Sequence, residues 1–167
     1  MQVLIVDDHA FIHESLAAVV RKAVPGAAVH VASSLAEAIA LARGNARLEF
    51  VLLDLGLPGC VGVEALARFR AALPKLRVAV VSANEDAECV HAAFAAGAAG
   101  YLPKTTPPSV MVATVRLIAE GGAWFPPEIM AMPPQDGKIA LTGRQADVLR
   151  LLVRGLGNRQ IARKLDI

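Results

Sequence analysis

Short apolar stretches alternate along the chain with longer segments in which apolar residues recur at helical spacing. The stretches are mostly β-branched or aromatic and predict strands at residues 2–6, 27–31, 50–53, 76–81 and 99–102. The longer segments are rich in Ala, Leu and Glu and predict helices at residues 11–24, 35–43, 63–73, 86–96 and 109–120. Ser34 followed by Glu37 predicts a capping box at the second helix.

Repeated strand–helix units with nearly continuous apolar strands predict an α/β fold, in which helices cover both faces of a parallel sheet. Right-handed crossovers leave few topologies for five strands, and we expect the flavodoxin-like, doubly wound order 2-1-3-4-5. Ligands of such sheets bind outside the carboxyl ends of the strands, so the chemistry is expected at that edge.

The pattern changes after residue 120. Residues 121–140 contain two Pro-Pro pairs and three Gly, which predicts a linker of limited flexibility. Residues 141–167 again repeat apolar positions at helical spacing and predict an amphipathic helix, a Gly-containing turn and a second short helix. We therefore divide the chain into a first domain at 1–120, a linker at 121–140 and a helical segment at 141–167.

Composition excludes several classes of protein. Hydrophobic residues make up 55% of the chain, but the longest stretch without a formal charge has 15 residues, from 89 to 103, whereas a membrane span needs roughly 20. No basic segment leads into an apolar one at the N-terminus, so we expect no signal peptide and a cytoplasmic protein. Cys60 and Cys89 lack CxxC spacing, which favours two free thiols.

Charge is unevenly distributed along the chain. Residues 1–125 hold 10 Lys and Arg against 11 Asp and Glu, whereas residues 138–167 hold 7 against 2. A neutral body followed by a basic tail indicates a nucleic-acid partner.

Polar side chains follow four of the predicted strands. Asp7 and Asp8 end the first, Asp54 the third, Ser82 the fourth and Lys104 the fifth. Three carboxylates in one pocket repel each other unless a cation joins them, and an all-oxygen site suits Mg²⁺ better than zinc. Asp54 is then a candidate nucleophile toward phosphorus, with Lys104 and Ser82 placed to bind the phosphoryl oxygens.

This constellation, with DLGLPG after the third strand and SA after the fourth, resembles the CheY-like receiver domain of response regulators over residues 1 to about 120. The resemblance implies that Asp54 is the phosphoacceptor for a sensor histidine kinase. It also implies that Asp8, Asp54, the Gly56 carbonyl and a water held by Asp7 bind Mg²⁺. Such a protein assists its own phosphorylation and dephosphorylation and is not an enzyme.

The resemblance assigns the remaining polar residues as well. Ser82 matches the hydroxyl switch residue, Lys104 the phosphate-binding lysine, and Tyr101 the aromatic residue that swings inward when the hydroxyl moves. Thr105 departs from the pattern, because many receivers have Pro after the lysine. Phosphorylation is expected to shift the population of conformers and to promote a homodimer.

The tail LTGRQADVLRLLVRGLGNRQIARKLDI is similar to the first half of the LuxR-type helix-turn-helix of NarL/FixJ response regulators. Gly157 stands where that family usually has a Ser cap. The printed chain stops at Ile167, before the helix that would enter the major groove. We therefore expect weak DNA binding without sequence preference from this chain, and a tail that is disordered, packs on the receiver or pairs with another chain.

The resulting interpretation is a bacterial two-component response regulator whose complete form controls transcription by binding DNA. The alternative is a stand-alone receiver that acts as an adaptor or phosphate sink through protein contacts. An aspartyl-phosphate phosphatase is disfavoured, because those sites usually place a second Asp where this chain has Gly56.

Aromatic and histidine residues outside this pattern have weaker signals. His9 and His13 lack the further ligands of a metal motif and are interpreted as surface or pocket-rim residues. We expect His91 to be partly exposed and assign it no role. Trp124 and Phe125 favour packing of the linker onto a domain over binding of a partner.

Overall fold

The computed structural model of the chain describes residues 1–131, which form one parallel sheet with helices on both faces. Its strand order is β2-β1-β3-β4-β5, as the repeats predict. The rest of the predicted linker and the whole segment 141–167 lie outside the described residues. The strands are β1 (Gln2–Val6), β2 (Ala28–Ala32), β3 (Leu48–Asp54), β4 (Arg77–Ser82) and β5 (Gly100–Pro103).

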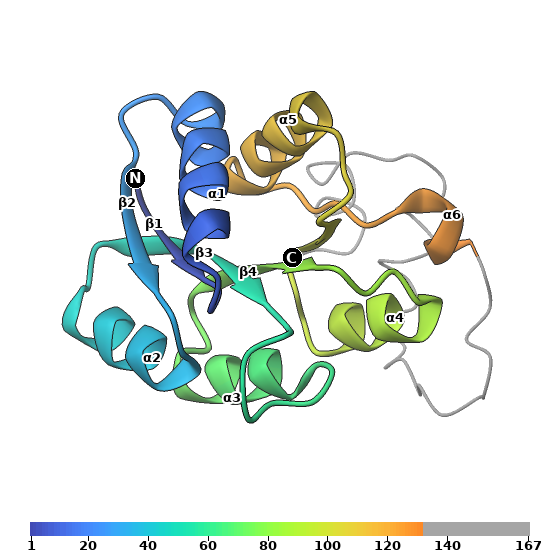
Figure 1. The fold of residues 1–167 in the computed structure, drawn as a ribbon, viewed down its shortest axis with the longest axis horizontal. Helices are drawn as coiled ribbons and strands as arrows, with labels where there is room; N and C mark the ends of the chain where they lie inside the picture. The colour runs from blue at the N-terminus through green and yellow to red at the C-terminus, as the bar shows by residue number, and fades with distance from the viewer. Residues whose placement is uncertain (132–167) are drawn as a thin grey trace, which may run out of the picture.

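Five helices form two layers around this sheet (Figure 1). Their bounds are α1 (Ala10–Ala23), α2 (Leu35–Gly44), α3 (Glu64–Ala72), α4 (Ala87–Ala95) and α5 (Pro108–Ala119). Helices α1 and α5 lie on one face, and α2, α3 and α4 lie on the other. Alternate residues of each strand therefore enter two separate apolar clusters, Val3 and Ile5 on the α1 side and Leu4 and Val6 on the α2 side.

The start of α2 follows the predicted cap with one change. The backbone N–H of Glu37 donates to the Ser34 hydroxyl at 3.2 Å, as a capping box requires. The Glu37 carboxylate accepts from the N–H of Ser33, at 2.8 Å, in place of the N–H of Ser34. Both side chains still satisfy donors at the helix start that would otherwise be unpaired.

The chain after α5 turns back and runs beside β5, the edge strand of the sheet. Trp124 forms a parallel bridge with Gly100, and the N–H of Tyr101 donates to the Trp124 carbonyl at 2.8 Å. A Cβ atom at position 100 would lie 2.9 Å from that carbonyl oxygen and 2.5 Å from Cδ1 of Ile118. A glycine at this position therefore permits the close approach. We call residues 122–130 the strap.

The strap continues into α6 (Pro127–Met130), which packs on α4. The Phe125 ring is buried and meets the Phe94 ring edge-on, with centroids 5.2 Å apart. The expected packing of Trp124 and Phe125 on the domain is confirmed. The expectation that His91 is partly exposed is wrong, because α6 covers it and its Nε2 atom lies 3.0 Å from the Ile129 carbonyl oxygen.

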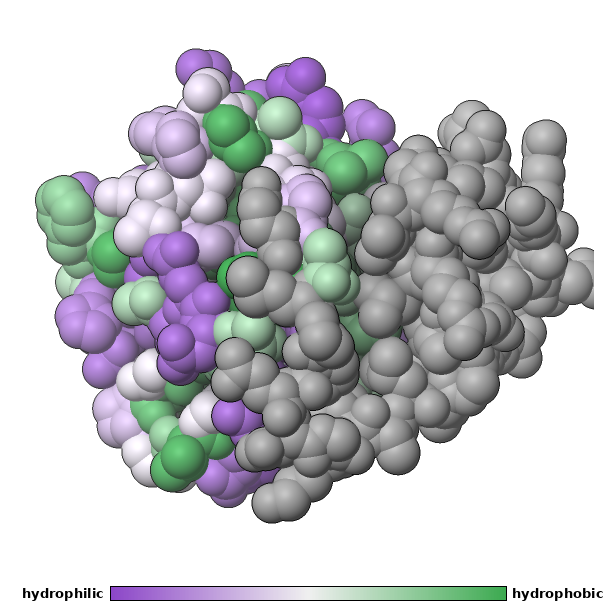
Figure 2. All heavy atoms as spheres, turned by 90° about the vertical axis from the view of Figure 1, so that its right-hand side faces the viewer, coloured by the Kyte–Doolittle hydropathy of each residue, from purple (hydrophilic) through white to green (hydrophobic). Residues whose placement is uncertain are grey.

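The surface of the described residues is mixed in polarity. Figure 2 shows hydrophilic and hydrophobic side chains interspersed over the described part of one face. Within residues 1–131 no helix combines the length and the apolar character that a membrane crossing requires.

Candidate functional site

Three carboxylates and an imidazole meet at the carboxyl edge of the sheet. Asp7 follows β1 and is completely buried, and Asp54 ends β3 and is nearly so. Asp8 and His9 lie on the solvent side, just before α1. One ligand atom from each of the four residues lies within 4.8 Å of the others. Because β1 and β3 are neighbouring parallel strands, residues 47 positions apart in the chain are brought together.

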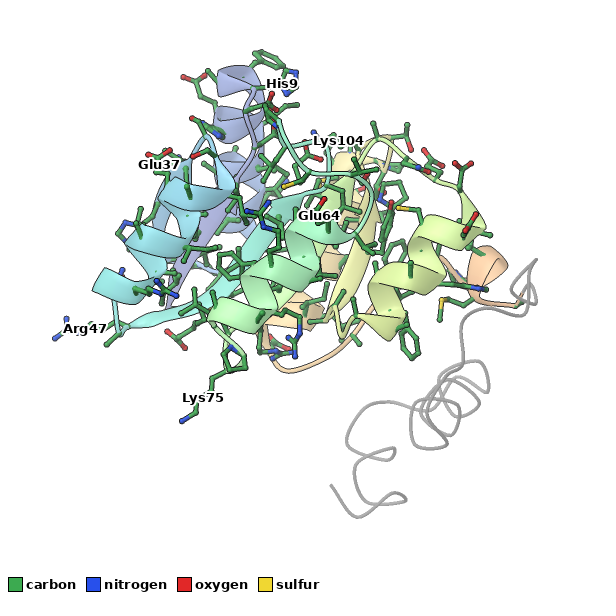
Figure 3. All side chains as sticks on the ribbon, turned by 90° about the horizontal axis from the view of Figure 1, so that it is seen from below. His9, Glu37, Arg47, Glu64, Lys75 and Lys104 are labelled. Atoms are coloured by element: carbon green, nitrogen blue, oxygen red, sulfur yellow. The ribbon has the colours of Figure 1, made fainter. Side chains whose placement is uncertain are left out.

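Lys104 joins the two buried carboxylates. Its Nζ atom donates to Asp7 Oδ2 at 2.7 Å and to Asp54 Oδ2 at 3.0 Å. Its backbone N–H donates to the Ser82 carbonyl at 2.8 Å, which fixes the chain directly after β5. Figure 3 shows Lys104 and His9 at the same end of the molecule and Arg47 and Lys75 at the opposite end.

The lysine determines the electrostatics of this cluster. Burial alone would raise the pKa of Asp7, but hydrogen bonds from Lys104 and His9 and the lysine charge outweigh it, so this pKa lies below its ordinary value. Burial alone would lower the pKa of Lys104, yet its hydrogen bonds and charge interactions with Asp7 and Asp54 raise it. At neutral pH, one ammonium group therefore partly neutralises two buried carboxylates.

The donor set fits a divalent cation of the hard, oxygen-preferring kind. Asp7, Asp8 and Asp54 supply carboxylate oxygens in one place, which are the ligands that Mg²⁺ prefers. Gly56 keeps the space beside them open, because a Cβ atom there would lie 3.1 Å from Asp54 Oδ2. The acidic cluster could hold a metal ion of this kind.

Ser82 and Tyr101 occupy the next part of the edge. The Ser82 hydroxyl accepts from the N–H of Asn84 at 3.1 Å. Tyr101 is completely buried, and its hydroxyl donates to the Asn84 carbonyl at 2.5 Å and to Cys89 Sγ at 3.4 Å. Burial raises the pKa of this hydroxyl above its ordinary value, and the hydrogen bond with Cys89 adds to the effect. The Tyr101 side chain is therefore enclosed within the fold in this structure.

A cavity of about 480 Å³ connects most of these residues. Its lining includes Asp54, Gly56, Ser82 and Lys104, all of which the sequence singled out. Asp7 lies beneath the lysine, and Tyr101 is not among the lining residues.

Several residues at the cavity were not indicated by the sequence pattern. His9 is indeed at the rim, but its imidazole also belongs to the acidic cluster, and its position directly after Asp7 and Asp8 was the available signal. Asn84, Cys60 and Cys89 also line the cavity, and nothing in their spacing indicated it.

Comparisons with known proteins agree with this geometry. The chain matches the family of response regulator receiver domains over residues 3–116 and the luxR family of bacterial regulatory proteins over residues 140–167. It is 32% identical over 180 residues to the glycerol metabolism activator of Pseudomonas putida, covering 99% of this chain and 81% of that protein. It is 31% identical over 174 residues to the nitrate/nitrite response regulator protein NarP of Escherichia coli, covering 99% and 80%.

The chain is also similar to solved structures of LuxR family response regulators. A LuxR family DNA-binding response regulator from Silicibacter pomeroyi aligns with a TM-score of 0.66 and 32% identity, over 75% of this chain and 97% of that one. A two-component response regulator of the LuxR family from Aurantimonas sp. SI85-9A1 aligns with a TM-score of 0.68 and 30% identity, over 77% and 91%.

Proposed function

The chain belongs to the two-component response regulators that join a receiver domain to a LuxR-type DNA-binding domain, and from this premise we propose that Asp54 is its phosphoacceptor. The observation that carries the proposal is the position of the Asp54 carboxylate. It ends β3 inside the cavity, 3.0 Å from the Lys104 ammonium and within 4.8 Å of the ligand atoms of Asp7 and Asp8.

The proposed reaction is a single phosphoryl transfer. A carboxylate oxygen of Asp54 attacks the phosphorus of a phosphohistidine on a sensor kinase, so that an O–P bond forms as the N–P bond breaks. The released imidazole nitrogen takes a proton from solvent. Lys104 Nζ, which already donates to Asp54, and the Ser82 hydroxyl, which belongs to a residue lining the same cavity, would donate to the phosphoryl oxygens in the product and lower the cost of the added charge.

A Mg²⁺ ion is the proposed cofactor. Asp8, Asp54 and the Gly56 carbonyl would hold it, with Asp7 holding a bound water. When bound, the ion supplies positive charge that offsets the charge on the phosphoryl group in the transition state. Asp7 keeps its negative charge for this role, because Lys104 and His9 hold its pKa low.

The proposed output is a change of conformation that controls transcription. Tyr101 joins both sides of this change, because its hydroxyl contacts the Asn84 carbonyl beside Ser82 and its N–H holds the strap. A phosphoryl group bound by Ser82 would change the populations of the conformers that differ in these contacts of Tyr101. The phosphorylated protein would then dimerise and bind promoter DNA in the cytoplasm.

The test is the intact mass of the protein after incubation with acetyl phosphate and Mg²⁺. We expect the wild type to gain one phosphate that hydroxylamine removes, and Asp54→Asn to gain none. Asp86→Asn, at an exposed aspartate just before α4, is the matched control and should be phosphorylated like the wild type. A folded wild type without any mass gain, or an equal gain in Asp54→Asn, would contradict the proposal.

A further inference from the structure

The imidazole of His9 lies between two carboxylates of the acidic cluster. Its Nδ1 atom is 2.9 Å from Asp8 Oδ1 and 3.0 Å from Asp7 Oδ1. The backbone N–H of His9 also donates to Asp7 Oδ1, at 2.9 Å, which fixes the residue beside the carboxylate. A proton on Nδ1 thus occupies a position that a cation shared by the two carboxylates would take.

Lys104 and His9 contact different oxygens of the Asp7 carboxylate. Lys104 Nζ bonds Oδ2, deep in the cluster, whereas His9 reaches Oδ1 from the solvent side. Lys104 is a permanent cation with no lone pair to offer a metal at neutral pH. Neutral imidazole, in contrast, is a common metal ligand in proteins, and the His9 side chain is 67% exposed to solvent.

We propose that His9 contributes a nitrogen ligand to the cation held by Asp8 and Asp54, which raises the affinity of this site for borderline transition metals such as Co²⁺ much more than its affinity for Mg²⁺. The proposal rests on the function proposed above, because it concerns the same metal site. Carboxylate, carbonyl and water ligands suit Mg²⁺, whereas imidazole suits the later transition metals. Mg²⁺ also gives up its bound water reluctantly, so a nitrogen ligand stabilises it little.

The neighbouring histidine provides a matched comparison. His13 lies on the first turns of α1, and its Nε2 atom is 2.5 Å from the backbone carbonyl oxygen of Asp7. It is not in the group of residues whose ligand atoms converge. Loss of His13 should therefore change the affinities for all metals by the same factor, because it acts through Asp7. Loss of His9 should change the ratio of the affinities for different metals.

The experiment measures Mg²⁺ and Co²⁺ affinities of the full chain by calorimetry, for the wild type, His9→Asn and His13→Asn. Asn keeps an amide that can bond both carboxylates, so the acidic cluster is preserved. We expect His9→Asn to weaken Co²⁺ binding about tenfold or more and to change Mg²⁺ binding less than about twofold. His13→Asn should leave the ratio of the two affinities as in the wild type. An unchanged ratio in His9→Asn would overturn the proposal.

A spectroscopic measurement identifies the ligand directly. In the wild type loaded with substoichiometric Cu²⁺, we expect nitrogen superhyperfine splitting in the EPR spectrum that disappears in His9→Asn and persists in His13→Asn. Persistence of the splitting in His9→Asn would overturn the assignment of this nitrogen to His9.

Asp54→Asn separates this inference from the proposed function. It should weaken binding of both Mg²⁺ and Co²⁺, and Co²⁺ binding that is unaffected by it would place the histidine site elsewhere and overturn the inference. Normal Mg²⁺-dependent phosphorylation with an unchanged metal ratio in His9→Asn would refute the role of His9 alone. Absence of Mg²⁺ binding and phosphorylation in the folded wild type would refute both.

Discussion

The carboxyl edge of the sheet and its β5 edge meet at Tyr101, and each is stabilised by a different kind of interaction. At the carboxyl edge, Asp7, Asp8 and Asp54 crowd together with one ammonium group, so like charges oppose each other. At the β5 edge, the strap is held by a backbone bridge and by apolar contacts. The first edge is held by charge interactions around Lys104, and the second by apolar packing and a backbone hydrogen bond.

Tyr101 connects the two edges through different parts of the same residue. Its hydroxyl donates to the Asn84 carbonyl near the carboxyl edge, and its N–H donates to the Trp124 carbonyl of the strap. A rearrangement that moves its ring therefore occurs on a strand to which the strap is hydrogen-bonded. The contrast predicts different responses to substitutions at the two edges.

The largest expected effect tests the strap. Phe125→Ala removes a buried ring that meets Phe94 edge-on, and it should lower the free energy of unfolding by about 3 kcal/mol. Phe11→Ala is the matched control, because Phe11 is 79% exposed, and it should change stability by less than about 0.5 kcal/mol. Urea denaturation of both variants measures the difference. Equal effects would mean that the strap adds no stability.

The next effect tests the carboxyl edge. Mg²⁺ at about ten times its dissociation constant should stabilise the wild type by about 1.4 kcal/mol, because it binds only the folded cluster. Asp54→Asn removes one of the carboxylates and should lose most of this gain. Asp86→Asn should retain it. Thermal unfolding with and without Mg²⁺ gives the result, and an equal gain in Asp54→Asn would place the metal elsewhere.

The smallest effect tests the residue at which the edges meet. Tyr101→Phe removes the hydroxyl that bonds Asn84 and Cys89, and it should lower the free energy of unfolding at pH 7 by about 1 kcal/mol.

The same variant has a pH signature. Burial raises the pKa of Tyr101 above its ordinary value of 10.0, so above pH 10 the unfolded chain loses this proton first. The contribution of Tyr101 is therefore complete below pH 10 and is lost as pH rises through the folded pKa. Denaturation curves from pH 7 to 11 should show the gap between wild type and Tyr101→Phe narrowing above pH 10. A constant gap would contradict this account.

The extent of agreement between sequence and structure varies with the type of feature. The first strand is predicted at its observed bounds, because every residue of Gln2–Val6 after the first is apolar and buried. The third strand is longer than its apolar run, because its backbone pairs with β1 at Leu48 and again from Phe50 onward, and the exposed Glu49 lies at a register shift between these two pairs. The strap looked like a linker, because its Gly and Pro content is typical of one.

Contacts between distant residues were beyond the sequence pattern. Nothing in the spacing indicated that Gly100 leaves room for the Trp124 carbonyl, or that α6 buries His91. Each depends on a path of the chain after α5 that no local pattern specifies. The candidate site was better predicted, because parallel strands bring all their carboxyl ends to one edge.

The sequence by itself determined the order of strands and helices and the polar residues that follow the strands, because periodicity and chain order are local properties. The tertiary structure alone decided that Lys104 bonds Asp7 and Asp54, 97 and 50 positions away, and that His9 joins the carboxylates. The physical reason is that hydrogen bonds act over about 3 Å. Such distances are set only when the packed helices and the sheet fix the directions of side chains from separate segments.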